Sequence, residues 1–143
     1  MKTNVIRPEY VTQFPADFEE GVLYISEEFE TAGHLCCCGC GERVITPLSP
    51  AKWQIRKSGK RVSLSPSVGN WKFACQSHYW ISFNEVIEDK KFDWNSIQMV
   101  QRRDRRDMDR YIERMNAAAE TVRVPKPSFV GKLVNWLAKL LGP

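Results

Sequence analysis

The sequence predicts an α+β fold, and three observations indicate it. Up to Ile87, short β-type segments alternate with glycine and proline, which is typical of short strands joined by turns. After Ile87, apolar residues recur at steps of three and four, which indicates helices. The cysteines and histidines are confined to two short clusters in the strand-rich part. We therefore expect a small antiparallel, zinc-stapled β-sheet or partly open barrel, followed by two C-terminal helices.

The domain boundary is expected at Ile87, where the composition changes. Residues 1–87 are predicted to form a zinc-stabilised β domain, and residues 88–143 a helical extension. Within the β domain, breakers separate the β-type segments; Gly21 precedes the first, and Pro47 ends the segment that begins at Arg43. The expected strands, in order, are 22–25, 34–37, 43–46, 53–55, 62–64, 72–75 and 79–83.

Two amphipathic helices are expected in the extension, at about 95–121 and 128–141, with Pro125 and Pro127 between them. The second is too apolar to stand alone in water. Because the first helix is long enough to cover the small sheet, we expect the second to dock on a partner, either another copy of this chain or a different protein.

The metal-binding prediction comes from the two clusters. The segment His34–Gly41 holds four of the five cysteines and one of the two histidines, and Cys75–His78 holds the others. Zinc takes four thiolate or imidazole ligands, commonly two from each of two short turns. Spacing alone leaves several pairs open in the first cluster: Cys37 with Cys40, Cys38 with Cys40, or Cys36 with Cys40. From the residues, the expected ligands are Cys75, His78 and two of Cys36, Cys38 and Cys40.

A catalytic metal is the minority interpretation. Catalytic zinc keeps an open position and usually has a carboxylate base nearby. Glu42 and Glu85 are the acids close in sequence, and neither belongs to a recognised protease or deaminase pattern. A Cys75–His78 nucleophile pair is disfavoured, since a spacing of three in a turn suits shared metal ligation better. No catalytic residue is assigned, and enzymatic activity is not expected.

Charge and composition narrow the function classes. The 143 residues carry a net charge of +4, and residues 1–87 are balanced at nine basic and nine acidic side chains. The arginines of 102–110 alternate with aspartates, which favours a solvated helix face over a nucleic-acid site. With no secretory leader and no apolar run of roughly 20 residues, a cytoplasmic location with reduced thiols is expected.

The ordered motifs of the β domain resemble one bacterial family. They are Gly21–Ser26, His34–Gly41, Thr46–Leu48, Trp53, Ser63–Trp71 and Cys75–Ile81. The family is an uncharacterised one with H-x-C-x-C-G-C-G and C-x-S-H-Y-W patterns, sometimes mislabelled as ammonia monooxygenase, and the resemblance covers residues from about 21 to 87. It implies metal ligands at Cys36, Cys38, Cys40, Cys75 and His78. It also leaves His34 as a further candidate and demotes Cys37.

The same resemblance implies a functional setting. Some members are encoded beside a multi-ubiquitin-like protein and its activating and conjugating enzymes, which would then be the partners of this chain. The first hypothesis is a zinc-binding accessory or ligase-like adaptor in ubiquitin-like conjugation, acting by protein docking, with antiviral defence as its setting. The alternatives are a zinc-dependent hydrolase acting on ubiquitin-like conjugates and a nucleic-acid-binding zinc module.

Overall fold

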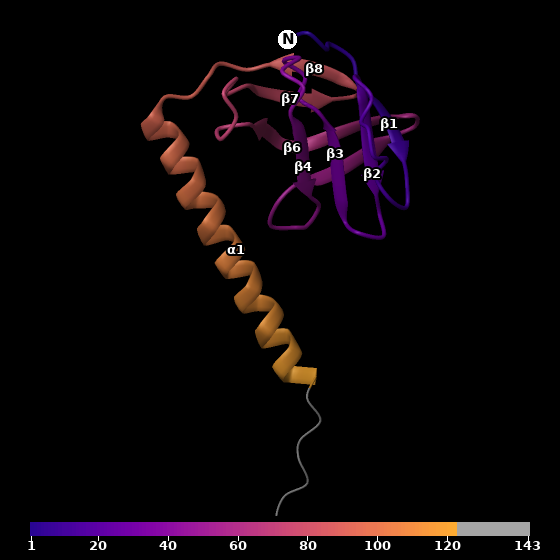
Figure 1. Cartoon of the computed structure of the whole chain (residues 1–143). Coiled ribbons are helices and arrows are strands. Elements are labelled where there is room, and N and C mark those ends of the chain that lie inside the picture. Colours follow the sequence, from indigo (N-terminus) through magenta and orange to yellow (C-terminus); the bar gives the residue numbers. More distant parts are fainter. Residues whose placement is uncertain (123–143) are drawn as a thin grey trace, which may run out of the picture. The chain divides into compact units, whose positions relative to one another are not determined.

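The computed structural model describes residues 1–122, which divide between Asp109 and Arg110 into two compact units. The first unit contains two four-stranded sheets (Figure 1) and the beginning of α1 (Trp94–Val122). The predicted α+β class is confirmed at this level. The sheets do not close into a barrel, and there are two of them where one was expected.

The first sheet has the strand order β1-β2-β3-β4. Its strands are β1 (Arg7–Tyr10), β2 (Val22–Ser26), β3 (Thr31–Leu35) and β4 (Arg43–Pro47). β1 runs parallel to β2, whereas β2, β3 and β4 pair antiparallel. The sequence predicts no strand before Val22, because Pro8 lies in the middle of β1. At a sheet edge this proline is tolerated, since one side of the strand makes no ladder.

The second sheet is antiparallel throughout, with the order β5-β6-β7-β8. Its strands are β5 (Gln54–Ser58), β6 (Arg61–Gly69), β7 (His78–Ser82) and β8 (Glu85–Glu88). The register between β6 and β7 shifts between Leu64, which pairs with Ile81, and Val68, which pairs with Tyr79. Three residues of β6 therefore face one residue of β7. Such a bulge bends a strand and re-aims its side chains.

The core lies between the two sheets. Along β4, β6 and β7, buried and more exposed residues largely alternate, as expected for strands with one face inward. Each large apolar side chain that leaves water contributes about 1.5–3 kcal/mol. The main buried members are Leu23, Ile25 and Val44 from the first sheet and Val62, Leu64, Val68, Tyr79 and Ile81 from the second.

The N-terminal segment joins the two sheets. Val5 forms an antiparallel bridge with Glu85, and Ile6 N donates to the carbonyl oxygen of Asn84 at 2.8 Å. The side chain of Ile6 is fully buried in the core. The chain thus runs along the edge of the second sheet before it enters the first.

The helical prediction is confirmed for the first helix only. α1 spans Trp94–Val122, close to the expected 95–121, and Ser96 N donates to Asp93 Oδ1 at 2.8 Å as an N-terminal cap. The predicted helix at 128–141 lies outside the described residues. Among residues 1–122, no helix is long and apolar enough to cross a membrane.

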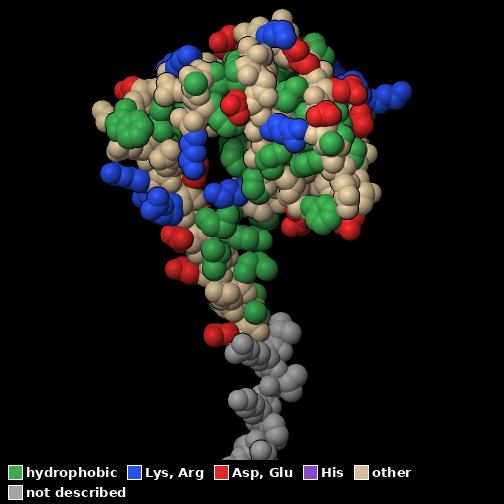
Figure 2. Space-filling view, viewed as in Figure 1, with side chains coloured by type: hydrophobic (Ala, Val, Ile, Leu, Met, Phe, Trp, Pro, Cys, Tyr) green, Lys and Arg blue, Asp and Glu red, His purple; other side chains and the backbone are tan. Residues whose placement is uncertain are grey.

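Surface charge in the strand-rich unit is mixed. On the face that Figure 2 shows, basic and acidic side chains are interspersed. This view shows no large patch of one sign of the kind that duplex nucleic acid requires.

Candidate functional site

The first half of the site is the turn that follows β3. Gly39 N donates to Cys36 O at 2.9 Å, and Cys36 N donates to Glu42 O at 2.8 Å, so the chain reverses within a few residues. Gly39 and Gly41 have φ values of 88° and 83°. Glycine adopts this left-handed region without steric cost, which lets the turn close tightly enough to bring its cysteines together.

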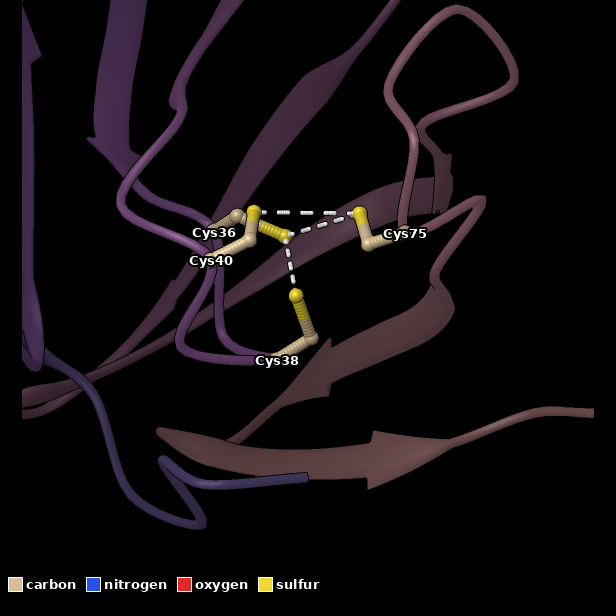
Figure 3. Close-up of side chains that lie close together, drawn as sticks. All are labelled: Cys36, Cys38, Cys40 and Cys75. Atoms are coloured by element: carbon tan, nitrogen blue, oxygen red, sulfur yellow. Dashed lines mark hydrogen bonds between the residues drawn. The ribbon is translucent and has the colours of Figure 1, made fainter.

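Four cysteine sulfurs meet at this turn. The Sγ atoms of Cys36, Cys38 and Cys40 from the turn and of Cys75 from the loop before β7 point toward one another (Figure 3) and all lie within 4.8 Å. Individual separations are 3.3 Å for Cys36–Cys38, 4.0 Å for Cys36–Cys75 and 3.8 Å for Cys40–Cys75. A tetrahedral shell with zinc–sulfur bonds of about 2.3 Å places its sulfurs roughly 3.8 Å apart. The group therefore fits a metal ion held by four thiolates.

The ionisation of these thiols fits the same interpretation. Burial raises the pKa of Cys38 to about 12 and also raises the pKa of Cys40. For Cys75, burial acts in the same direction but is outweighed by hydrogen bonds from Ser77 and the neighbouring thiols, which lower its pKa to about 7. The Cys75 thiol therefore ionises readily, whereas Cys38 and Cys40 would need a nearby cation to do so.

A buried polar network surrounds the cluster. The amide Nδ2 of Asn70 lies 3.3 Å from Cys36 Sγ, 2.9 Å from Ser77 Oγ and 3.4 Å from the hydroxyl of Tyr79. Ser77 Oγ in turn contacts Cys36 Sγ at 3.1 Å. Asn70 and Ser77 flank the loop that joins β6 to β7, so these contacts fix that loop against the cysteine turn.

Two other predicted candidates lie apart from the sulfur group. His34 is fully buried, its Nε2 contacts the Tyr79 hydroxyl at 2.8 Å, and burial lowers its pKa to about 4. Cys37 is buried as well, and burial raises its pKa to about 12. Both side chains belong to the core around Tyr79.

His78, which the sequence analysis placed among the metal ligands, is not brought into the sulfur group. Its Nε2 lies 2.9 Å from Ser67 Oγ, and its Nδ1 lies 3.0 Å from the carbonyl oxygen of Lys90. The carboxylate of Asp89 lies 3.7 Å from the same Nδ1. In the structure, His78 lies between Ser67 and Asp89.

The strands of the second sheet create this arrangement. Ser67 lies in the bulge of β6, His78 is the first residue of β7, and Asp89 directly follows β8. Asp89 N donates to His78 O at 2.9 Å, which continues the β7–β8 ladder by one residue. The bulge of β6, the start of β7 and the end of β8 therefore meet at one end of the sheet.

The carboxylate of Asp89 is held by an indole. Trp80 Nε1 donates to Asp89 Oδ2 at 3.0 Å. This hydrogen bond is the main cause that lowers the pKa of Asp89, and the backbone amide of Lys90 adds to it. The carboxylate therefore stays ionised near His78.

Aromatic rings cover the imidazole of His78. Phe92 and Trp71 stack with centroids 5.2 Å apart, and they lie 4.5 Å and 5.1 Å from the His78 ring. His78 is only 3% exposed as a result. Gly69 makes room for this cover, because a Cβ atom there would lie 2.2 Å from Trp71.

A serine hydroxyl against an imidazole whose other nitrogen is hydrogen-bonded is the arrangement used in nucleophilic catalysis. The sequence analysis assigned no role to Ser67 or Asp89: Ser67 lies within the Ser63–Trp71 motif but in no known nucleophile pattern, and Asp89 lies beyond the residues that carry the resemblance. Neither acid considered there takes part: Glu42 is exposed beside the cysteine turn, and Glu85 begins β8. The three residues come together through the pairing of β6, β7 and β8, and no local sequence pattern indicates that pairing.

Comparison with known proteins identifies a family to which the chain is similar. We found no matching curated protein and no matching solved structure. A family model described as "Bacterial ubiquitination-like system serine protease (BubE)" matches residues 10–88, more than half of the 143 residues. The match includes all four clustered cysteines, Ser67 and His78, and it ends one residue before Asp89. It agrees with the setting that the sequence resemblance implied. The chain therefore belongs to the BubE family of bacterial ubiquitination-like systems.

Proposed function

We propose that this chain is a serine protease that cleaves ubiquitin-like proteins or their conjugates, with Ser67 as nucleophile and His78 as general base. The observation that carries the proposal is the 2.9 Å contact between Ser67 Oγ and His78 Nε2. The description of the family supports it. This differs from the first sequence-based hypothesis, in which the chain had no catalytic role.

The contacts define the proposed steps. With Nδ1–H of His78 donated to Lys90 O, Nε2 is free to accept the Ser67 proton. Ser67 Oγ then attacks the substrate carbonyl carbon, and the collapse of the tetrahedral intermediate breaks the C–N bond while His78 returns the proton to the leaving amine. Water, deprotonated by His78, hydrolyses the resulting acyl-serine and regenerates the hydroxyl.

Asp89 has a supporting role in this scheme. Its carboxylate lies 3.7 Å from His78 Nδ1, which is too long for a hydrogen bond but close enough to stabilise an imidazolium. Catalytic contacts are often longer before substrate binds. Trp80 holds the carboxylate in this position.

We propose that Cys36, Cys38, Cys40 and Cys75 bind one zinc ion with a structural role. When bound, the metal would tie the turn after β3 to the loop before β7. Four thiolates would complete a tetrahedral shell and leave no open position, which disfavours a zinc-dependent hydrolase with Glu42 as its base. His78 is three residues beyond Cys75, so the metal would stabilise the start of the strand that carries the proposed base.

The test is cleavage of a fusion in which the ubiquitin-like protein of the same bacterial system carries a C-terminal reporter. We expect Ser67→Ala to reduce cleavage at least about a thousandfold, as loss of a serine nucleophile does. Ser65→Ala is the matched control, because Ser65 is exposed in the same bulge, and it should keep most of the activity. Equal cleavage by both variants would refute the assignment.

An adaptor role is the second candidate, and the closed four-sulfur shell favours it over metal catalysis. An adaptor acts by docking and does not require Ser67. If Ser67→Ala supports ubiquitin-like conjugation as well as the wild type does, the adaptor proposal is preferred. A role in antiviral defence stays an expectation.

A further inference from the structure

The outer face of the second sheet carries exposed apolar side chains. Trp80 pairs directly with Ile87 across β7 and β8, and Val5 bridges to Glu85. Since Ile81 and Val86 are buried, their neighbours Trp80 and Ile87 project outward. Residues directly opposite share a face, so Val5 lies on the same side as Glu85 and Ile87. We name Val5, Trp80 and Ile87 the outer strip; they are 65%, 41% and 49% exposed.

The outer strip begins at the proposed active site. Trp80 is two residues beyond His78 on the same strand, and its indole donates to Asp89 at 3.0 Å. Trp80, at one end of the strip, therefore contacts Asp89, whose carboxylate faces the proposed base His78. If a protein substrate places its cleavage site at Ser67 and its chain runs past Asp89, the rest of that protein would cover the strip. A small substrate bound at Ser67 would not extend to the strip.

Two acidic residues lie on the same face as the strip. Glu85 and Asp89 follow the alternation of β8 and so lie on the same face as Ile87. An apolar surface with acidic neighbours matches a partner surface that is apolar and flanked by basic side chains. Its three side chains fall well short of the roughly 20–30 residues a side of a stable interface, which suits a substrate that is released after each turnover.

We propose that the outer strip is the docking surface for the folded domain of the ubiquitin-like substrate, which directs the substrate's C-terminal end toward Ser67. The proposal rests on the proposed function. It assigns the strip to substrate recognition and the serine–histidine pair to bond cleavage.

The test uses the full chain with Ile87→Ser, and Ile45→Ser is the matched control. Ile45 is 48% exposed, almost the same as Ile87, but lies on β4 in the other sheet. Binding of the ubiquitin-like protein is measured by calorimetry in a Ser67→Ala background, so that no cleavage occurs. Hydrolysis of a small ester, p-nitrophenyl acetate, is measured with Ser67 present.

We expect Ile87→Ser to weaken binding about tenfold or more, as for a central interface residue, and Ile45→Ser to leave it unchanged. Ester hydrolysis should stay within about twofold of wild type in both variants, because neither residue contacts the reacting groups.

Unchanged binding by Ile87→Ser overturns the docking proposal. So does a shift from dimer to monomer in light scattering without weaker substrate binding, since the strip would then join two copies. Absence of ester hydrolysis in the wild type would count against the proposed function, while the binding measurement would still decide the docking.

Discussion

The side chain of Asn70 connects the cysteine turn after β3 to the loop that joins β6 to β7. Its amide contacts Cys36 Sγ, Ser77 Oγ and the Tyr79 hydroxyl, and its own backbone N–H donates to Ser77 O at 2.9 Å. No other type of side chain of this size offers two N–H donors for these acceptors. The residue is 7% exposed, so water cannot easily replace these contacts.

Asn70→Ala should therefore destabilise the strand-rich unit. Leaving buried acceptors without a donor costs about 1–3 kcal/mol, which we expect as a lower midpoint in urea unfolding. Asn95→Ala, at an exposed position in the first turn of α1, is the control and should change the midpoint little. Equal midpoints for the two variants would show that the Asn70 contacts contribute nothing to stability.

The close contact between Gly69 and Trp71 is the basis of a second prediction at the residue scale. An added Cβ would lie 2.2 Å from the Trp71 ring, so Gly69→Ala should displace Trp71 from His78 and reduce cleavage at least about tenfold. Gly59→Ala is the control: it introduces backbone strain at φ 59° in the β5–β6 turn but meets open space. If both alanine variants lose activity equally, general destabilisation and not the aromatic cover explains the loss.

At the scale of elements, the sequence predicts features that lie within one segment better than it predicts which strands pair. α1 was predicted nearly at its observed bounds, because its periodicity and its Asp93 cap lie within one segment. The cysteines were recognisable as candidate ligands because each cluster is short. Ser67 and Asp89 were missed since they approach His78 only through the bulge of β6 and the end of β8.

The proposed metal ligands are the basis of the prediction at this scale. Cys75→Ser should lose the zinc, whereas His78→Ala should keep about one zinc per chain and lose cleavage, because His78 contacts Ser67 and not the sulfurs. Elemental analysis of the purified variants measures the metal directly. Loss of zinc in His78→Ala would restore the ligand set that the sequence favoured and would count against the proposed base.

For the whole molecule, the sequence established the class but not the assembly of the sheets. Strands at 22–25 and 43–46 were recognisable from β-type runs next to breakers, but the parallel pairing of β1 and the division into two sheets depend on contacts distant in sequence. The candidate site depends on the pairing of successive strands in the second sheet, which places His78 beside Ser67 and apart from the cysteine group.

The central claim is that Ser67 is a nucleophile activated by His78, and covalent labelling tests it most directly. A fluorophosphonate probe phosphonylates an activated serine Oγ and releases fluoride, so only a serine paired with a base reacts rapidly. Mass spectrometry of the labelled full chain should show one adduct, located on Ser67, and His78→Ala with its metal retained should show none. Absence of labelling in the wild type, or an adduct on a different serine, would contradict the account.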